Sequence, residues 1–304
     1  MFTILTAANR KMPLDASHVG TAAPDQIIDV SPRRALAFAA GIEYPAPSAY
    51  DDADEETFKC LPFFCVALEW SLSLATAKGA FGMTPQETMR ALHAGQDTIF
   101  HQAIRPGARV KVGGRLVSAK STSAGVLATT RMEIRDAETD AVYSTTYTDA
   151  LFAGVPLDGE NTSIDDRPPR QARPPLTAEG PNLASTRVSI DQGFTHRYSE
   201  CAQIWNPIHT EQKIARSFGL PGIIVHGTAL WSIAGRELLD AYGNLQPGRL
   251  KRLSGRFAKP VRPGTDIIIR HQRDTSRPEE ISFSVINDDQ EEAVSEGFAI
   301  INPL

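Results

Sequence analysis

The two halves of this 304-residue chain carry the same landmarks in the same order. Arg105-Pro106-Gly107 recurs as Arg262-Pro263-Gly264 at an offset of 157, and Leu61-Pro62 recurs as Leu220-Pro221 at an offset of 159. Two separate landmarks with nearly equal offsets indicate a duplicated structural unit of roughly 140 to 160 residues. The chain is therefore expected to fold as two related units.

A proline-rich segment lies between the two copies. Residues 167–176 contain four prolines and are flanked by polar residues, which is typical of an extended linker. We place an N-terminal unit at 1–160, the linker at 161–180 and a C-terminal unit at 181–304.

Each unit has the pattern of a helix, an irregular stretch, a longer apolar helix and then several strands. The long helices are predicted at about 63–78 and from Gly227 onward, where apolar residues recur at helical spacing. Shorter helices are expected at 197–202 and 209–218, and a short strand at 222–227. Further β-rich runs are separated by turn residues and lie at 110–117, 124–134, 143–152, 266–271, 280–286 and 293–301. Hairpin spacing predicts antiparallel sheets, so the fold class is an α+β double unit whose two sheets can join edge to edge.

Composition excludes several classes of protein. A formal net charge of -5 and a pI near 5.8 give no electrostatic basis for binding nucleic acid or an anionic membrane. The three cysteines, Cys60, Cys65 and Cys201, have no metal-ligand spacing, so no metal site is predicted and a reducing compartment, the cytoplasm, is expected. The first residues do not have the pattern of an export signal, and no run reaches the ~20 apolar residues of a membrane span.

The segment from Trp205 to His209 is the first candidate for chemistry. The Asn206-Pro207 pair disfavours helical geometry and predicts a sharp turn, after which His209 can face a cleft. A histidine in that place is suited to acid/base work. A helix-capping or core histidine remains the alternative.

The second candidate is His226-Gly227, at the start of the long apolar helix. A glycine there exposes a backbone N–H at the positive end of the helix dipole, and no side chain blocks a ligand oxygen. This arrangement is suited to an oxyanion hole for a thioester carbonyl. Alternatively, Gly227 only allows close packing, and His226 is a buried histidine with its hydrogen bonds satisfied.

The repeat provides an internal control for both candidates. At an offset of 159, the positions of Asn206, His209, His226 and Gly227 correspond to Pro47, Tyr50, Ala67 and Leu68. None of the polar groups recurs. Residues needed only for folding are expected in both copies, so this difference favours a function confined to the second half.

The same residues carry a resemblance to a known family. Residues 198–209, Ile224-Val225-His226-Gly227 and the stretch 256–264 together resemble the MaoC-like (R)-specific enoyl-CoA hydratases and dehydratases. The resemblance implies two hotdog folds with a catalytically silent first half, which residues 92–96 and 104–107 match. It also implies addition of water to a trans-2-enoyl thioester, or the reverse reaction, with an aspartate and a histidine holding the water.

In one position the chain departs from the family pattern. The family has its aspartate two residues before the asparagine, and here that residue is Ile204. Isoleucine cannot exchange a proton, so His209 acts alone or another carboxylate replaces the aspartate. Glu200, one helical turn earlier, is the candidate replacement, and a solvated helix-face carboxylate is the alternative.

Four further residues complete the predicted binding site. Arg252 and Arg256, close to Lys251, can meet the phosphates of coenzyme A or of a carrier-protein arm, or they are solvated surface charges. Trp205 and Ile204 can line the acyl pocket, and Trp205 can equally fill core. His226 is grouped with these substrate-binding residues.

The sequence thus predicts a hydro-lyase of acyl thioesters, with His209 as acid/base, Asn206 orienting it and the Gly227 N–H as oxyanion donor. Two alternatives stay open: a non-catalytic acyl-CoA-binding hotdog protein, and a proton-transfer isomerase or cyclase that uses His209 alone. The expected partner is an acyl-CoA or acyl-carrier-protein thioester, with no other cofactor. A homodimer is expected by analogy.

Overall fold

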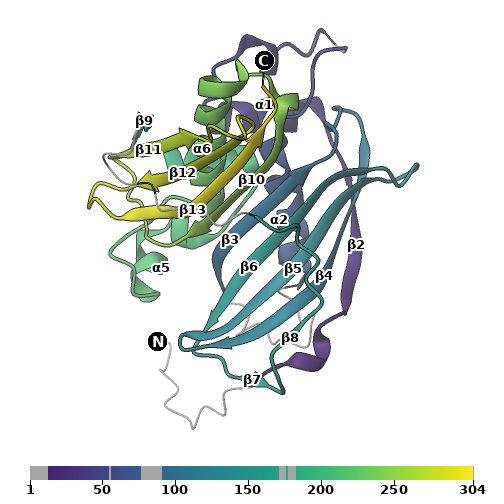
Figure 1. The fold of residues 1–304 in the computed structure, drawn as a ribbon, viewed down its shortest axis with the longest axis vertical. Helices are drawn as coiled ribbons and strands as arrows, with labels where there is room; N and C mark the ends of the chain where they lie inside the picture. Colours follow the sequence, from purple (N-terminus) through teal and green to yellow (C-terminus); the bar gives the residue numbers. More distant parts are fainter. Residues whose placement is uncertain (1–12, 55, 77–90, 171–175, 177–182, 304) are drawn as a thin grey trace.

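The computed structural model describes residues 13–54, 56–76, 91–170, 176 and 183–303. In this part of the chain eleven strands form one long twisted sheet, two short strands pair separately, and the helices pack against the long sheet (Figure 1). No helix among the described residues has the length and apolar character needed to cross a membrane.

The first unit holds two α-helices and the strands that surround them. Ser31 caps the first helix by accepting a hydrogen bond from the Arg34 N–H, and Pro32 occupies the first helical position. Its elements are β1 (Leu14–Asp15), η1 (Ala16–His18), β2 (Ala22–Asp29), α1 (Pro32–Gly41), η2 (Pro47–Ala49), η3 (Pro62–Phe64), α2 (Cys65–Thr76), β3 (Ala91–Phe100), β4 (Arg109–Thr122), β5 (Gly125–Asp136), β6 (Val142–Ala153), β7 (Leu157–Asp158) and β8 (Thr162–Ser163).

The second unit repeats this order. Its long helix ends at Asn244, which takes the left-handed conformation that stops a helix. Its elements are β9 (Ala184–Ile190), α4 (Phe194–Ala202), η5 (Pro207–His209), α5 (Gln212–Ser217), α6 (Gly227–Gly243), η6 (Pro247–Arg249), β10 (Leu250–Phe257), β11 (Thr265–Arg273), β12 (Glu280–Ile286) and β13 (Glu292–Ile301).

The sheet order shows the duplication directly. The order is β2-β4-β5-β6-β3-β10-β13-β12-β11-β9, so the second half runs through equivalent strands in reverse. The halves join through the antiparallel pair β3–β10, in which Arg252 is opposite Ile99 and Arg256 opposite Gly95. The predicted α+β double unit with edge-to-edge sheets is therefore confirmed.

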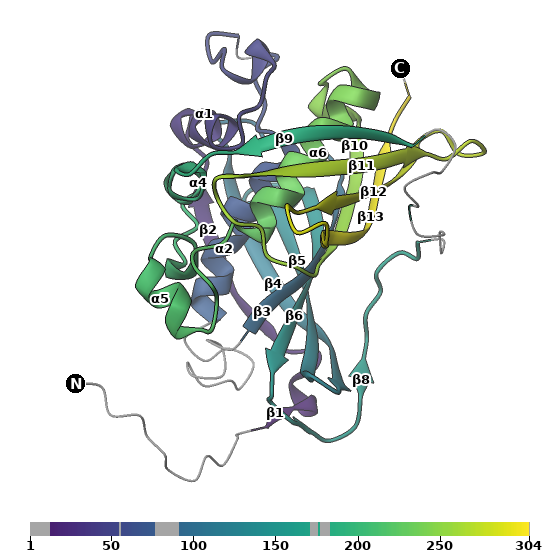
Figure 2. The same cartoon turned by 90° about the vertical axis from the view of Figure 1, so that its left-hand side faces the viewer.

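The central helices of both units share one core. Phe63, just before α2, packs edge-on against Trp231 of α6, with ring centroids 6.0 Å apart. Gly235 makes this contact possible, because a Cβ there would lie 2.3 Å from the Phe63 ring. Helix α1 of the first unit also lies beside α4, the first helix of the second unit (Figure 2).

The strands β2, β3, β9 and β10 were not predicted, and two local predictions differ from the structure. No strand forms where one was expected at 222–227, and the backbone before α6 is irregular there. One hydrogen bond of 2.8 Å joins it to the segment between β10 and β11, from the Val225 N–H to the Val261 carbonyl. Residues 210–211 separate η5 from α5, so the helix expected at 209–218 is two short pieces. The predicted linker at 161–180 lies partly outside the described residues.

Candidate active site

Helix α4 ends abruptly just before the candidate residues. Gln203 adopts a left-handed conformation with φ 57° and ψ 36°, and the Ile204 N–H donates back to the Ser199 carbonyl at 3.1 Å. The chain therefore leaves the helix before Ile204.

Asn206 begins the turn that presents His209. Its side-chain oxygen accepts from the Ile208 N–H at 3.4 Å, and its carbonyl accepts from the His209 N–H at 3.0 Å. Asn206 therefore places His209 through the backbone of a 3-10 turn.

His209 has one nitrogen fixed by the protein. Its Nδ1 lies 2.8 Å from the Ile224 carbonyl oxygen. A carbonyl only accepts, so Nδ1 carries the proton and Nε2 presents a lone pair. Among the described residues, no group makes a hydrogen bond to that Nε2 atom.

His226 forms the wall behind His209. The two rings stack with centroids 3.7 Å apart and an interplanar angle of 25°. On its other side, the His226 Nε2 atom lies 3.1 Å from the Ser199 hydroxyl. With only 1% of its surface exposed, this ring cannot line an acyl pocket. The predicted substrate contact of His226 is therefore wrong, and the residue instead supports His209.

Burial sets the charge of both imidazoles. It lowers the pKa of His209 to about 4, against a smaller opposite effect of the Ile224 carbonyl. Burial and then the neighbouring His209 ring lower the pKa of His226 well below its usual range, while the Ile204 backbone partly opposes this. Both rings are neutral at pH 7, so His209 can accept a proton.

Gly227 follows His226 directly and is the first residue of α6. No described residue accepts a hydrogen bond from its N–H, as expected for the first turn of a helix. The residue is partly exposed, and its missing side chain leaves room against Phe257, whose ring lies 3.1 Å from where a Cβ would stand. The stacked histidines thus put an imidazole base beside a helix N-terminus.

Two aromatic residues near Gly227 were not among the predicted site residues. Phe257, at the end of β10, faces Gly227, and His93 of β3 packs edge-on against Phe257 with centroids 4.7 Å apart. His93 brings the first unit to the site. Its only sequence signal is its place in residues 92–96, which the family resemblance had already marked.

No carboxylate takes the place of the missing aspartate among the described residues. Ile204 is 5% exposed and belongs to the hydrophobic core. Glu200 is exposed and accepts a hydrogen bond from the Trp205 indole at 3.2 Å. Glu200 fails as the replacement because α4 ends before Ile204 and its side chain turns to Trp205.

The remaining predicted contacts divide between surface and core. Trp205 is 54% exposed, so it does not fill core. Arg256 is an exposed side chain whose guanidinium lies 3.7 Å from the Glu296 carboxylate.

Arg252 is neither a surface charge nor available to phosphates. It is 5% exposed and binds Asp97 through two hydrogen bonds of 2.8 Å each, across the β3–β10 pair. It also donates to the Pro168 carbonyl at 2.7 Å. Because these partners occupy the guanidinium group, the phosphate-binding role predicted for Arg252 is wrong.

Matching backbone hydrogen bonds define the equivalent residues of the two units. The Ala49-to-Ala46 turn bond of 3.0 Å matches that of His209 to Asn206, and the Phe64-to-Leu61 bond of 3.0 Å matches that of Ala229 to His226. Asn206, His209, His226 and Gly227 therefore correspond to Ala46, Ala49, Leu61 and Pro62.

The uniform offset of 159 named the wrong counterparts. From His209 to His226 the chain advances 17 residues, whereas from Ala49 to Leu61 it advances 12, so the offset changes between the two motifs. The corrected counterparts in the first unit also lack the polar groups of the second unit. The first unit lacks the backbone donor as well, because Pro62 at the helix start has no N–H to offer.

Comparison with known proteins places both halves in related families. A model described as "MaoC like domain" matches residues 178–292, and one described as "FAS1-like, dehydratase domain region" matches residues 17–144. A probable enoyl-CoA hydratase 2 of Dictyostelium discoideum is 34% identical over 123 residues, which are 40% of each chain. The chain therefore spans less than half the length of this relative.

Solved structures share the fold over nearly the whole chain. A MaoC-like dehydratase from Phytophthora capsici has a TM-score of 0.78 at 18% identity, covering 95% of this chain and 98% of that one. A Mycobacterium tuberculosis protein described as having a double hotdog fold has a TM-score of 0.57 at 15% identity, covering 93% of this chain and 96% of that one. The second half of the chain is thus a MaoC-like domain, the first half matches the FAS1-like dehydratase region, and together they have the double hotdog fold.

Proposed function

We propose that this protein is a hydro-lyase of acyl thioesters, which removes water from a β-hydroxyacyl thioester or adds it to the enoyl product. One observation carries the proposal: His209 keeps Nε2 unoccupied by described residues, and its ring stacks on His226, the residue that precedes the first N–H of α6. A base and an oxyanion donor at one partly exposed place are what this chemistry requires.

The dehydration step needs one acid/base group. The thioester carbonyl accepts the Gly227 N–H, which stabilises the negative charge that develops on its oxygen. His209 Nε2 takes the α-proton, and the electron pair of that C–H bond forms the enolate. The enolate then expels the β-hydroxyl as the double bond forms, and imidazolium Nε2 protonates it, so water leaves and His209 is neutral again.

The low pKa of His209 favours the second part of this step, in which the departing hydroxyl is protonated. A histidine with a pKa of about 4 is a weak base but a strong acid once protonated. It therefore releases the proton readily to the departing hydroxyl. Hydration requires an oriented water as well, and Ile204 offers no group to orient it.

Replacing His209 tests the proposal. We expect His209→Ala to lower kcat/KM for an (R)-3-hydroxyacyl-CoA by about 100-fold or more, the usual contribution of one acid/base group. His18→Ala, a change in η1 of the first unit, serves as the control and should leave turnover unchanged. Equal rates for wild type and His209→Ala would exclude the assignment.

Ile204 specifically favours a second candidate, an isomerase or cyclase that moves a proton with His209 alone. Product analysis distinguishes the possibilities. Gain or loss of water identifies the hydro-lyase, a shifted double bond identifies the isomerase, and binding without conversion identifies a non-catalytic acyl-CoA-binding protein.

The proposed partner is an acyl group carried by coenzyme A or by a carrier protein. The first unit is proposed to shape the site without catalysing, because it supplies His93 but has alanines where the second unit has Asn206 and His209. A cytoplasmic location and a homodimer remain proposals from the sequence.

A further inference from the structure

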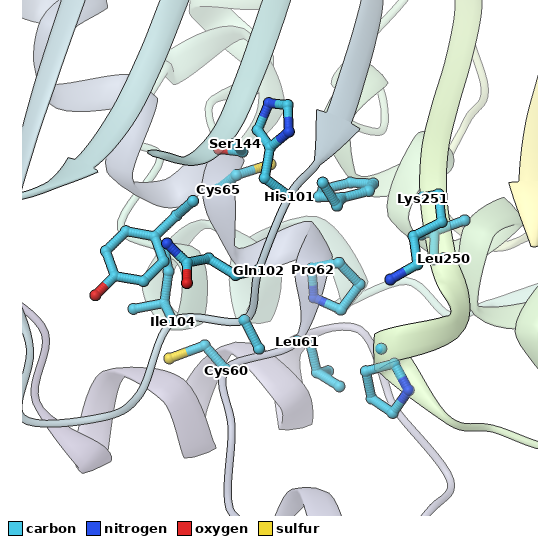
Figure 3. Close-up of a pocket in the computed structure, with 15 residues that line it drawn as sticks. Cys60, Leu61, Pro62, Cys65, His101, Gln102, Ile104, Ser144, Leu250 and Lys251 are labelled. Carbon is cyan, nitrogen blue, oxygen red and sulfur yellow. The ribbon is translucent and has the colours of Figure 1, made fainter. Parts of the chain in front are cut away.

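A second pocket lies at the opposite end of the β3–β10 pair from His93 and Phe257 (Figure 3). Its volume is about 130 Å³, several times the ~30 Å³ that one water molecule occupies in the liquid. Residues of both units line it: Cys60, Leu61, Pro62, Cys65, Phe100, His101, Gln102, Ala103, Ile104, Tyr143, Ser144, Pro247, Gly248, Leu250 and Lys251.

This pocket is the structural twin of the candidate active site. The Cys60 N–H donates to the Ile104 carbonyl at 3.0 Å, as the Val225 N–H donates to the Val261 carbonyl beside the active site. Leu61 and Pro62 begin the central helix of the first unit, as His226 and Gly227 begin α6. Phe100 ends β3 as Phe257 ends β10.

This twin pocket lacks the base and the backbone donor that the proposed dehydration requires. Ala46 and Ala49 stand where the second unit has Asn206 and His209, and Pro62 has no N–H to polarise a carbonyl. Burial raises the pKa of Cys60 to about 12 and that of Cys65 well above its usual range. Both thiols therefore remain protonated and unreactive.

Most polar side chains that line the twin pocket already form hydrogen bonds within the protein. His101 Nε2 lies 3.0 Å from the Thr145 hydroxyl, the Gln102 amide donates to the Val142 carbonyl at 3.2 Å, and the Tyr143 hydroxyl donates to Asp136. Two further groups, one hydroxyl and one amine, have no hydrogen-bond partner among the described residues.

Ser144 and Lys251 are those two groups. Ser144 is 4% exposed, and within the described part of the chain its hydroxyl has no hydrogen-bond partner, a costly condition for a buried polar atom. The Lys251 amine extends toward Pro62 (Figure 3) and pairs with no described carboxylate. The apolar wall of the pocket comes from Leu61, Phe100, Ile104 and Leu250.

We propose that this twin pocket binds a small monocarboxylate with an apolar body, such as a short fatty-acid anion. The carboxylate pairs with the Lys251 amine, and the hydrocarbon part covers the apolar wall. The cationic group selects an anion. Binding here does not depend on turnover at His209.

Calorimetric titration of the full chain with sodium hexanoate tests the proposal. Wild type should bind one hexanoate per chain, and hexanamide, which has the same body without the charge, should bind at least about 10-fold more weakly. Lys251→Met should weaken hexanoate binding at least about 10-fold, and Lys251→Arg should keep most of it.

Two controls separate this pocket from other sites. Lys259→Met changes a lysine that pairs with Glu291 at 2.9 Å and should leave hexanoate binding unchanged. His209→Ala should also leave it unchanged. No saturable binding by wild type, binding that survives in Lys251→Met, or binding that His209→Ala abolishes would each overturn the proposal, whatever the outcome of the turnover assays.

Discussion

His209 owes its proposed role to its neighbours on two sides. The Ile224 carbonyl fixes the proton on Nδ1, and the buried His226 ring packs at 3.7 Å against its face. Together with burial, these contacts leave a neutral imidazole with one nitrogen available to substrate. A side chain held in this way has little rotational freedom left to lose when substrate binds.

Ile204 provides a test of whether the site retains the family geometry. Ile204→Asp restores a proton-exchanging group and should hydrate crotonyl-CoA at least about 10-fold faster than Ile204→Asn. Both variants bury a polar group in place of a side chain that is 5% exposed, so each should lose about 2 kcal/mol or more of stability. Equal hydration rates for the two variants would show that this position does not face the reacting atoms.

Single residues were predicted unevenly from the sequence. Asn206, His209 and Gly227 were found because turn chemistry and a helix start leave local signals. Phe257 and His93 were missed because the contact of Phe257 with Gly227 and that of His93 with Phe257 join residues distant in sequence and leave no local signal. The burial of Arg252 was missed for the same reason, since its partner Asp97 lies in the other unit.

At the scale of elements, the starts of the two central helices differ in one hydrogen-bond donor, the backbone N–H of the first helical residue. Leu61, with φ -61° and ψ 145°, precedes Pro62, and His226, with φ -60° and ψ 135°, precedes Gly227. The backbone is the same, yet only the second helix offers an N–H at its first position. The duplicated fold thus keeps its shape while the donor is confined to one copy.

The elements themselves were largely predictable. Hydrophobic periodicity gave the long helices, and the β-rich runs of the second unit coincide with β11, β12 and β13. The strand expected at 222–227 was wrong, because β-branched residues there serve to pack a loop against the sheet. Val225 is 3% exposed and Ile223 is 4% exposed, so burial rather than strand pairing explains their type.

Helix α2 carries a buried carboxyl group whose titration should affect stability. Burial raises the pKa of Glu69 to about 7, partly offset by the Thr146 hydroxyl. Between pH 4.5 and 7 the native state holds a proton that the unfolded chain has lost, so stability falls as pH rises. The stability of Glu69→Gln relative to wild type should therefore rise with pH by roughly 3 kcal/mol across this range.

Urea denaturation at pH 5 and pH 8 measures the Glu69 effect. Glu138→Gln, a change at an exposed turn residue, is the matched control and should show no comparable trend. A constant difference between Glu69→Gln and wild type at both pH values would contradict the raised pKa.

At the scale of the whole molecule, a buried ion pair holds the two units together. Asp97 and Arg252 are 1% and 5% exposed and lie on the adjacent central strands β3 and β10. The segment after β8 crosses the same joint, with Arg167 bound to Asp149 and Arg170 donating to the Ser254 hydroxyl. One hydrophobic cluster contains residues of both units, so the described chain should unfold as a single structure.

Removing one partner of this pair should therefore destabilise the whole chain. Arg252→Met leaves Asp97 buried without its cation and should cost about 3–5 kcal/mol in the free energy of unfolding. Arg256→Ala, four residues along the same strand, removes an exposed charge and should change stability by less than about 0.5 kcal/mol. Equal midpoints for both variants in urea would show that the Asp97–Arg252 pair does not secure the joint.

The edge-to-edge sheet was predictable from the duplication, because two related open sheets remove a pair of free edges by joining. Which strands meet was not predictable, since the order β3–β10 depends on long-range pairing. The buried Asp97–Arg252 pair also has no local sequence signal.

The most direct test of the proposed active site compares two changes at Gly227. Both Gly227→Ala and Gly227→Pro place a Cβ near Phe257, but only proline removes the N–H. The backbone accepts proline because His226 has the extended geometry that Leu61 has before Pro62. We predict that kcat/KM for an (R)-3-hydroxyacyl-CoA is about 100-fold lower in Gly227→Pro than in Gly227→Ala, the usual effect of losing one oxyanion donor. Equal kcat/KM in two folded variants would contradict the assignment of this helix start as the oxyanion site.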